Sequence, residues 1–171
     1  MNQLTTLPHY RIAVVASSWH RDIVDRALSA MLDEFGRRGL PASQVDRFDV
    51  PGAFELPLHA SKLAQTRRYD AIVCCGLVVN GGIYRHEFVA SAVIDGLMRV
   101  QLDAEVPVLS AVLTPREFHE HETHRRFFGE HLVEKGIEAA RACLQTLASL
   151  QAMAAQCTAS NAAASARAGT A

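Results

Sequence analysis

The sequence predicts an α/β protein, a three-layer αβα sandwich with a four-stranded parallel sheet. Short apolar runs rich in β-branched residues alternate with longer segments whose apolar residues recur at helical spacing, in the order βαβαβαβα. The connections between the apolar runs are long enough for the right-handed crossovers that parallel strands require. A chain of 171 residues suffices for one domain with a substantial core.

The first strand and helix follow a polar N-terminal arm, residues 1–10, and open the folded domain expected over residues 11–150. Arg11–Ser17 is a short apolar run that predicts a buried strand. Ser18 is a candidate N-cap for a helix with one apolar stripe, which Gly36 ends.

The second strand is predicted over Gln44–Val50, where alternating polarity favours a position near an edge of the sheet. Pro51-Gly52 breaks this pattern. Ala53–Thr66 then predicts a helix with Pro57 in its first turn, where a missing N–H costs little.

The second half of the chain repeats this arrangement. Ala71–Val79 predicts a buried strand, residues 84–103 a helix, and Pro107–Leu113 a fourth strand. Thr114-Pro115 is expected to cap and open the last helix, because proline favours the first helical position.

The last helical pattern runs from Arg116 to Leu150, with a joint expected near Gly129. Residues 151–171 are mostly small or polar, and we expect this tail to be disordered because it buries too little apolar surface.

The predicted order is that of a flavodoxin-like fold, in which ligands collect beyond the carboxyl ends of the strands. Four loops follow those ends and are expected to converge on one edge: residues 18–20, 51–55, 80–86 and 114–115.

Composition argues against several classes of partner. The chain has 17 basic and 18 acidic residues, so it lacks the basic excess of a nucleic-acid or membrane-surface binder. No apolar run reaches the ~18 residues of a membrane span, and the first residues lack a signal peptide's apolar region, so a cytoplasmic location is expected. The four cysteines form no CxxC pair, which disfavours zinc–thiolate chemistry.

Gly81-Gly82 stands between the third strand and the third helix. Glycines let backbone N–H groups approach an anion, and the helix start offers its positive end. Arg85 and His86, a fixed charge and a titratable ring, follow at once. An ordinary turn also uses such glycines, but this context favours a phosphate cradle.

Trp19, the only tryptophan, falls on the first of these loops. It either covers a helix end or offers a flat face for stacking a heteroaromatic ring. Phe54 is either a core or a pocket residue. Glu55 lies in a first helical turn, where the helix dipole stabilises a carboxylate whatever its function, and it is also a candidate acceptor for hydroxyls or ring N–H groups.

A histidine-rich stretch follows the fourth strand. His121 and His124 are spaced to share a metal, but spacing fixes no third ligand, so we expect a solvated helix face. A phosphate-facing role for His131 or a nearby arginine is the alternative. The other member of the stretch is His119.

Four segments carry a resemblance to a known family, in the same order and on the same elements. On them the chain resembles lumazine synthase, of riboflavin biosynthesis, over nearly all of Arg11–Leu150. The segment GGIYRHEFV, together with Trp19, is similar to sequences of the type II, decameric branch of that family. The segments are VPGAFELP at 50–57, GLVVNGGIYRHEFV at 76–89, VPVLSAVLT at 106–114 and EKGIEAA at 134–140.

The resemblance implies a reaction that uses neither a metal nor an organic cofactor. 5-Amino-6-ribitylaminopyrimidine-2,4-dione condenses with 3,4-dihydroxy-2-butanone 4-phosphate to give 6,7-dimethyl-8-ribityllumazine, phosphate and water. An amine attacks a ketone, water leaves, phosphate is eliminated and the ring closes.

The resemblance also implies binding residues. Trp19 would stack on the pyrimidine ring, and Lys135 would reach the pocket from a neighbouring subunit. The remaining matches are Ala53, Phe54 and Glu55 for the ring and ribityl chain, Leu77, Val78 and Val79 for backbone hydrogen bonds to the ring, and Gly82 and Ile83 for the phosphate.

The family's catalytic histidine aligns on Arg85, and His86 takes the next position. Proton transfer needs a group that titrates near neutrality, which His86 is and Arg85 is not. Arginine suits a departing phosphate, as a fixed planar cation. We predict His86 as the acid/base and Arg85 as the phosphate clamp, while a part for Arg85 in proton transfer stays open.

Two further positions depart from the family's pattern. A pocket aromatic from the neighbouring subunit aligns on Ser110. The phosphate-binding arginine aligns on Phe127, which leaves Arg126 or His131 as candidates for that role.

The resemblance implies a homo-oligomer of pentamers, with sites at subunit interfaces. Residues 125–136, RRFFGEHLVEKG, are bulky where the shell-forming members look small and glycine-rich. We therefore expect a continuous or differently angled helix, and two stacked pentamers rather than a shell.

Two other functions compete with this one. The same pocket is suited to hold riboflavin or the lumazine product without making it, which the departures at 85, 110 and 127 favour and Glu55 and Lys135 disfavour. An electron-carrying flavoprotein would place a Ser/Thr-rich phosphate loop after its first strand, and SSWHRD at 17–22 is too short for that.

Overall fold

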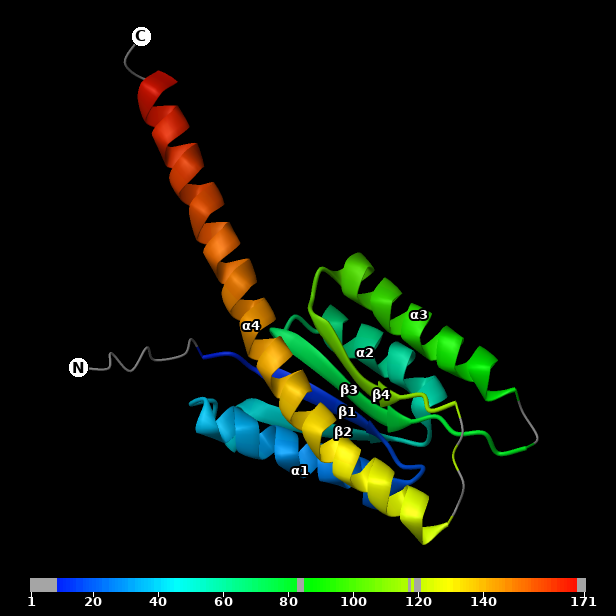
Figure 1. Ribbon diagram of the computed structural model, residues 1–171. Coiled ribbons are helices and arrows are strands. Elements are labelled where there is room, and N and C mark those ends of the chain that lie inside the picture. The colour runs from blue at the N-terminus through cyan, green and yellow to red at the C-terminus, as the bar shows by residue number, and fades with distance from the viewer. Residues whose placement is uncertain (1–8, 83–84, 117, 119–120, 169–171) are drawn as a thin grey trace.

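A computed structural model describes residues 9–82, 85–116, 118 and 121–168, with side chains up to Ser160. Within these residues four parallel strands form one sheet in the order β2-β1-β3-β4, with helices on both faces (Figure 1). The predicted α/β class is confirmed. The strands are β1 Ile12–Ser17, β2 Val45–Val50, β3 Ala71–Leu77 and β4 Val108–Leu113, and the helices are α1 Arg21–Arg37, α2 Leu56–Gln65, α3 His86–Ala104 and α4 Glu122–Ala168, with short 3₁₀ turns η1 Ala42–Gln44 and η2 Ala53–Glu55.

The centre of the sheet consists of β1 and β3, which are buried along their whole length. Both faces of these strands are covered by helices, so their sequences are continuous apolar runs without alternation. β2 lies at an edge, and its residues are partly exposed as its alternating sequence predicts.

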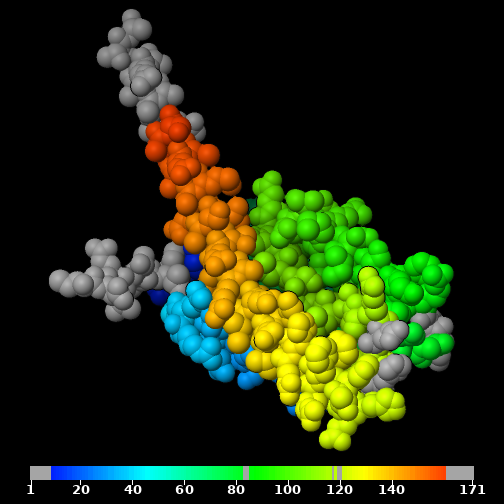
Figure 2. All heavy atoms as spheres, viewed as in Figure 1, coloured from blue at the N-terminus to red at the C-terminus, as the bar shows by residue number. Residues whose placement is uncertain are grey.

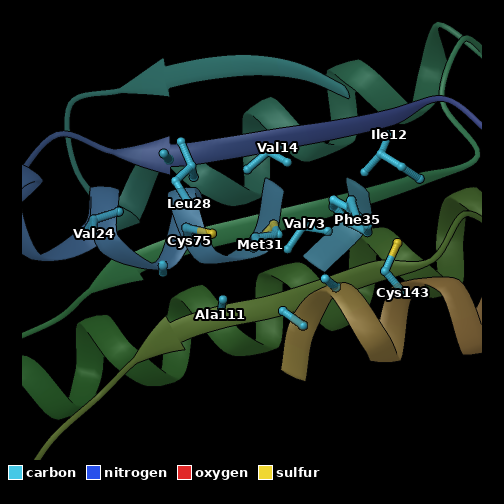
Figure 3. Packing of buried hydrophobic residues seen from close by; sticks show 14 of the residues in the cluster. Ile12, Val14, Val24, Leu28, Met31, Phe35, Val73, Cys75, Ala111 and Cys143 are labelled. Carbon is cyan, nitrogen blue, oxygen red and sulfur yellow. The ribbon is translucent and has the colours of Figure 1, made fainter. Parts of the chain in front are cut away.

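Two apolar clusters fill the layers. One lies between the sheet and α1 with α4, and it contains Phe35, Met31 and Leu132 (Figure 3). The other lies between the sheet and α2 with α3, and it contains Leu56 and Val93. The helices are therefore fixed against the sheet by burial of apolar surface on both faces.

The start of α1 differs from the expectation that Ser18 caps it. The N–H of Ser18 donates to the carbonyl oxygen of Val50 at 2.8 Å, so Ser18 continues the pairing with β2. His20 occupies the N-cap instead, with a left-handed φ of 54° and no side-chain cap. The loop that carries Trp19 is thereby held against the end of β2.

The last helix begins at Glu122, so the expectation that Thr114-Pro115 opens it was wrong. The chain must first pass from the end of β4 to the face covered by α1. Phe118 anchors this crossing: it is 6% exposed, and its ring lies 5.3 Å from that of His20 and 5.4 Å from that of Phe128.

No joint interrupts α4 at Gly129. Gly129 and Gly136 instead allow α4 to approach α1 closely. A Cβ at Gly129 would lie 2.9 Å from Nη1 of Arg26, and one at Gly136 would overlap the carbonyl oxygen of Ala27. The joint expected near Gly129 was therefore wrong, and of the two alternatives expected for residues 125–136 the continuous helix is observed. These glycines serve helix packing.

The tail beyond residue 150 is helical to Ala168 rather than disordered. Alanine has the highest helix propensity, and a helix that packing has already nucleated extends at little cost. Tyr10 Oη donates to Oε1 of Gln151 at 2.8 Å where α4 leaves the body, and residues 151–160 are all exposed (Figure 2). Within the described part of the chain, no helix is long and apolar enough to cross a membrane.

Candidate functional site

A cavity of about 400 Å³ opens at the carboxyl edge of the sheet. Three of the four loops expected at this edge line it, together with the first turns of α3; the fourth, residues 114–115, borders a separate hollow. The lining residues are Trp19, His20, Pro51, Gly52, Ala53, Phe54, Glu55, Leu77, Val78, Val79, Gly81, His86 and Val89.

One wall of the cavity is built from Trp19, Gly52 and Glu55. The N–H of Gly52 donates to Oε2 of Glu55 at 2.9 Å. A Cβ on Gly52 would lie 3.3 Å from that oxygen and 3.5 Å from Cε3 of Trp19. Gly52 therefore lies between the indole and the carboxylate, and a side chain there would contact the indole at ordinary distance and crowd the carboxylate oxygen by a few tenths of an ångström. Sequence reasoning missed this role, although a glycine three residues before a glutamate at a helix start was a signal for it.

The Trp19 side chain is 69% exposed and Phe54 is 64% exposed, so neither is a core residue. Both line the cavity, which favours the pocket interpretation of each. Apolar and aromatic walls with few polar groups are typical of small-molecule sites.

The end of β3 forms the floor. Leu77, Val78 and Val79 line the cavity, as the matched positions predict. The N–H of Val78 already donates to the carbonyl oxygen of Leu113 at 2.9 Å. A ring bound here would therefore use backbone groups other than this N–H.

The side chains of Arg85 and His86 point to different surroundings. His86 opens α3, its side chain is 13% exposed, and it lines the cavity, with Nδ1 3.5 Å from Oε2 of Glu87. The guanidinium of Arg85 lies 4.5 Å over the ring of Phe88, and Arg85 does not line the cavity. Within one chain, His86 is the member of the pair that lines the cavity.

The diglycine turn is held by Asn80, whose Oδ1 accepts the N–H of Gly82 at 3.0 Å. Gly82 has a φ of +76°, a conformation that favours glycine. Gly81 lines the cavity and Gly82 does not. Ile83, the other predicted phosphate residue, lies outside the described residues.

Besides Arg85 and Gly82, four further predicted site residues do not line this cavity: Ser110, Arg126, His131 and Lys135. Ser110 is exposed on β4, which is an edge strand. The other three lie on α4, on the opposite face of the sheet (Figure 1). Lys135 Nζ lies 2.6 Å from Oε2 of Glu138, and Arg126 lines a different hollow beside Asp22.

The lining residues of the cavity include one carboxylate and two imidazoles, and none of the described ones is a lysine or arginine. In the histidine-rich stretch, His119 lies outside the described residues. Among the residues that are described, no three His, Cys, Asp or Glu side chains gather as metal ligands would.

Comparison with known proteins supports one family. A model of the 6,7-dimethyl-8-ribityllumazine synthase family matches residues 9–151. The chain is 61% identical over 143 residues to 6,7-dimethyl-8-ribityllumazine synthase of Rhodococcus erythropolis, covering 84% of this chain and 92% of that one. It is 58% identical over 141 residues to 6,7-dimethyl-8-ribityllumazine synthase 2 of Bradyrhizobium diazoefficiens, covering 82% and 84%. It is 52% identical over 140 residues to the protein of the same name in Pseudomonas syringae, covering 82% of each. The chain therefore belongs to the 6,7-dimethyl-8-ribityllumazine synthase family.

Proposed function

We propose that this protein catalyses the lumazine synthase reaction of riboflavin biosynthesis, the condensation of the ribitylaminopyrimidinedione with 3,4-dihydroxy-2-butanone 4-phosphate. The observation that carries the proposal is the meeting of Trp19, Glu55 and His86 in one cavity of about 400 Å³. These are a stacking surface, an acceptor and a proton-transfer group, which is what the condensation needs.

The pyrimidinedione binds between the Trp19 indole and the apolar floor. A flat exposed indole stacks on a heteroaromatic ring, and Glu55 accepts hydrogen bonds from ring N–H groups or ribityl hydroxyls. Glu55 is held at the cavity wall by the N–H of Gly52, so its second oxygen remains for the ligand. Orientation of the two substrates against each other supplies much of the rate.

His86 moves the protons. The 5-amino nitrogen attacks the ketone carbon, and the carbonyl oxygen leaves as water after it gains two protons. Loss of a proton from the adjacent carbon then drives cleavage of the C–O bond to phosphate, which leaves with the bonding electrons. The enol that remains gains a proton on its terminal carbon and loses its hydroxyl proton, which gives a methyl ketone. The ribitylamino nitrogen attacks this new carbonyl, and a second water leaves. An imidazole ring can both accept and donate a proton through its nitrogens, so one side chain serves both directions of transfer.

On this proposal the protein is a homo-oligomer, a decamer of two pentamers. Predicted site residues that lie far from the cavity of their own chain act across the subunit interfaces. Ser110, Lys135 and either Arg126 or His131 would then serve a neighbour's site. Arg85, whose guanidinium lies over the Phe88 ring, is one candidate for the phosphate clamp. Exposed apolar side chains on the outer face of α3 support such an interface: Phe88, Ile94, Met98 and Leu102. We expect the enzyme to act in the cytoplasm.

The direct test combines both substrates with purified protein and follows the lumazine chromophore together with phosphate release. We expect one phosphate per lumazine formed. Reactions that lack either substrate are the controls. If riboflavin binds and quenches the Trp19 fluorescence, but the protein forms no lumazine from the two substrates, the protein would be a non-catalytic binding paralogue.

A further inference from the structure

We propose that Arg116, in the loop after β4, binds the phosphate group of the phosphorylated ketone. This inference rests on the proposed function and concerns the part of the site that the sequence left least defined. It assigns a specificity-determining residue outside the set that the family's pattern supplied.

The supporting feature is a second hollow of about 330 Å³ beside the main cavity. It is lined by His86, Glu87, Ala90, Thr114, Pro115 and Arg116. His86 is the residue common to both spaces. A substrate that reaches from one space to the other therefore passes the imidazole.

Charge separates the two spaces. The described lining of the main cavity contains no lysine or arginine, so within one chain a phosphate dianion meets no fixed cation there. The second hollow is lined by Arg116 and Thr114, beside the start of the 19-residue helix α3. A planar guanidinium binds phosphate through two parallel hydrogen bonds, and a helix start favours an anion.

The Arg116 side chain is also available to bind a ligand. It is exposed and forms no hydrogen bond or ion pair with any residue that the structure describes. The carboxylate in the hollow, Glu87, is 60% exposed and lies beside His86 Nδ1 at 3.5 Å. Glu87 therefore lies beside the imidazole, and among the described residues it forms no ion pair with Arg116.

The competing cations are placed elsewhere. The Arg85 guanidinium lies on the Phe88 ring. Arg126 lines a hollow formed with α1. His131 stacks on Phe127 at an interplanar angle of 2°. Among these candidates Arg116 alone lines a space that His86 also lines.

This placement fits the elimination step. With the pyrimidine ring on Trp19 and the phosphate on Arg116, the four-carbon chain lies across His86. The carbon adjacent to the one that bears the phosphate then loses its proton to the imidazole. The phosphate leaves toward Arg116 with the electrons of the C–O bond.

The test compares Arg116→Ala, Arg116→Lys and the control Arg37→Ala. Arg37 is an exposed arginine whose partner Glu34 keeps two other arginines, Arg38 and Arg141. We expect Arg116→Ala to raise both the KM for the phosphorylated ketone and the inhibition constant of inorganic phosphate by about 10- to 100-fold, since charged hydrogen bonds are lost. Arg116→Lys should restore part of this loss. The KM for the pyrimidinedione, and its quenching of Trp19 fluorescence, should stay within about twofold.

Unchanged values of both constants in Arg116→Ala would overturn the proposal, as would losses of this size in Arg126→Ala or Arg85→Ala instead. Absence of lumazine formation by the wild type would reject the proposed function. Calorimetric titration of inorganic phosphate into wild type and Arg116→Ala would still decide the Arg116 assignment in that case.

Discussion

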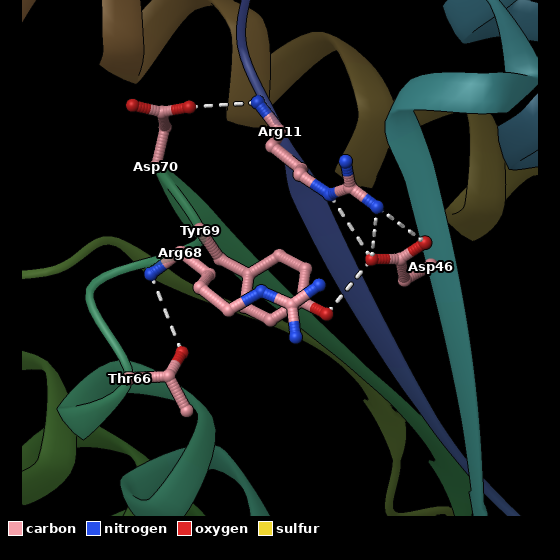
Figure 4. Close-up of polar contacts among 6 residues, drawn as sticks. All are labelled: Arg11, Asp46, Thr66, Arg68, Tyr69 and Asp70. Atoms are coloured by element: carbon pink, nitrogen blue, oxygen red, sulfur yellow. Dashed lines mark hydrogen bonds and ion pairs between the residues drawn. The ribbon is translucent and has the colours of Figure 1, made fainter.

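The polar side chains at the two ends of the parallel strands differ in their partners. We compare the amino edge of the sheet, where the strands begin, with the carboxyl edge, where they end. At the amino edge, Asp46 accepts hydrogen bonds from both Nε and Nη2 of Arg11 and from Oη of Tyr69 at 2.8 Å, and Asp70 accepts the N–H of Arg11 at 2.7 Å (Figure 4). At the carboxyl edge, Glu55 contacts a backbone N–H and His86 a neighbouring carboxylate, beside an open cavity.

The difference separates stability from binding. Polar groups that bind one another stabilise the folded state, and the pairs at the amino edge are of this kind. Polar groups beside an apolar cavity keep hydrogen-bonding capacity that a ligand can use. The parallel arrangement of the strands places these two kinds of edge at opposite ends of one sheet.

The largest expected effect comes from His86→Ala. Loss of a general acid/base lowers kcat by about 10²- to 10⁴-fold. The thermal midpoint should change little, because the imidazole makes no network in the core. His9→Ala, near the amino edge, is the matched control and should leave kcat unchanged. Wild-type turnover in His86→Ala, with turnover abolished in Arg85→Ala, would reverse the assignment of roles.

Asp46→Ala should show the opposite pattern. It removes the shared acceptor of Arg11 and Tyr69 and should lower the free energy of unfolding by about 1–3 kcal/mol, measured by urea denaturation. The KM for both substrates should be unaffected. Asp33→Ala, at an exposed position on α1, should change stability far less. A loss of activity without loss of stability in Asp46→Ala would contradict the division between the edges.

The features that could be predicted from the sequence are those that depend on consecutive residues in the chain. Continuous apolar runs identified β1 and β3, and the loops after the strands identified Trp19, Glu55 and His86. Gly52 was missed as a site residue because its importance depends on a neighbour 33 positions earlier in the chain. Arg116 was missed because the pattern predicted a helix there. The helical tail was missed because low apolar content was weighed above the helix propensity of alanine.

Gly52→Ala sharpens the comparison within the carboxyl edge. The added methyl would crowd the carboxylate oxygen of Glu55, which must move by a few tenths of an ångström, at a cost of about 1 kcal/mol, and would weaken pyrimidinedione binding about fivefold. Titration by Trp19 fluorescence measures this. Gly36→Ala meets nothing within 4 Å and serves as the control. Equal affinities of the two variants would show that the wall tolerates a side chain.

The smallest expected effect is a pH dependence from α1. Hydrogen bonds from Arg141 and then Arg38 lower the pKa of Glu34 from 4.5 to about 2. A carboxylate with a depressed folded-state pKa stabilises the protein above pH 4.5, and this contribution is lost as the pH falls toward 2. Urea midpoints between pH 5 and pH 2 should fall less steeply in Glu34→Gln than in wild type. Glu105→Gln is the control, and an identical slope in Glu34→Gln would rule out this source of acid sensitivity.

The continuation of α4 beyond the body offers a selective attachment point. Cys74, Cys75 and Cys143 are buried, and burial raises the pKa of each thiol, while Cys157 is exposed on the projecting helix. A maleimide dye would thus couple at Cys157, six residues past the contact between Tyr10 and Gln151. Energy transfer between dyes on different protomers would then report how copies of the chain assemble, without modifying the edge where substrates bind.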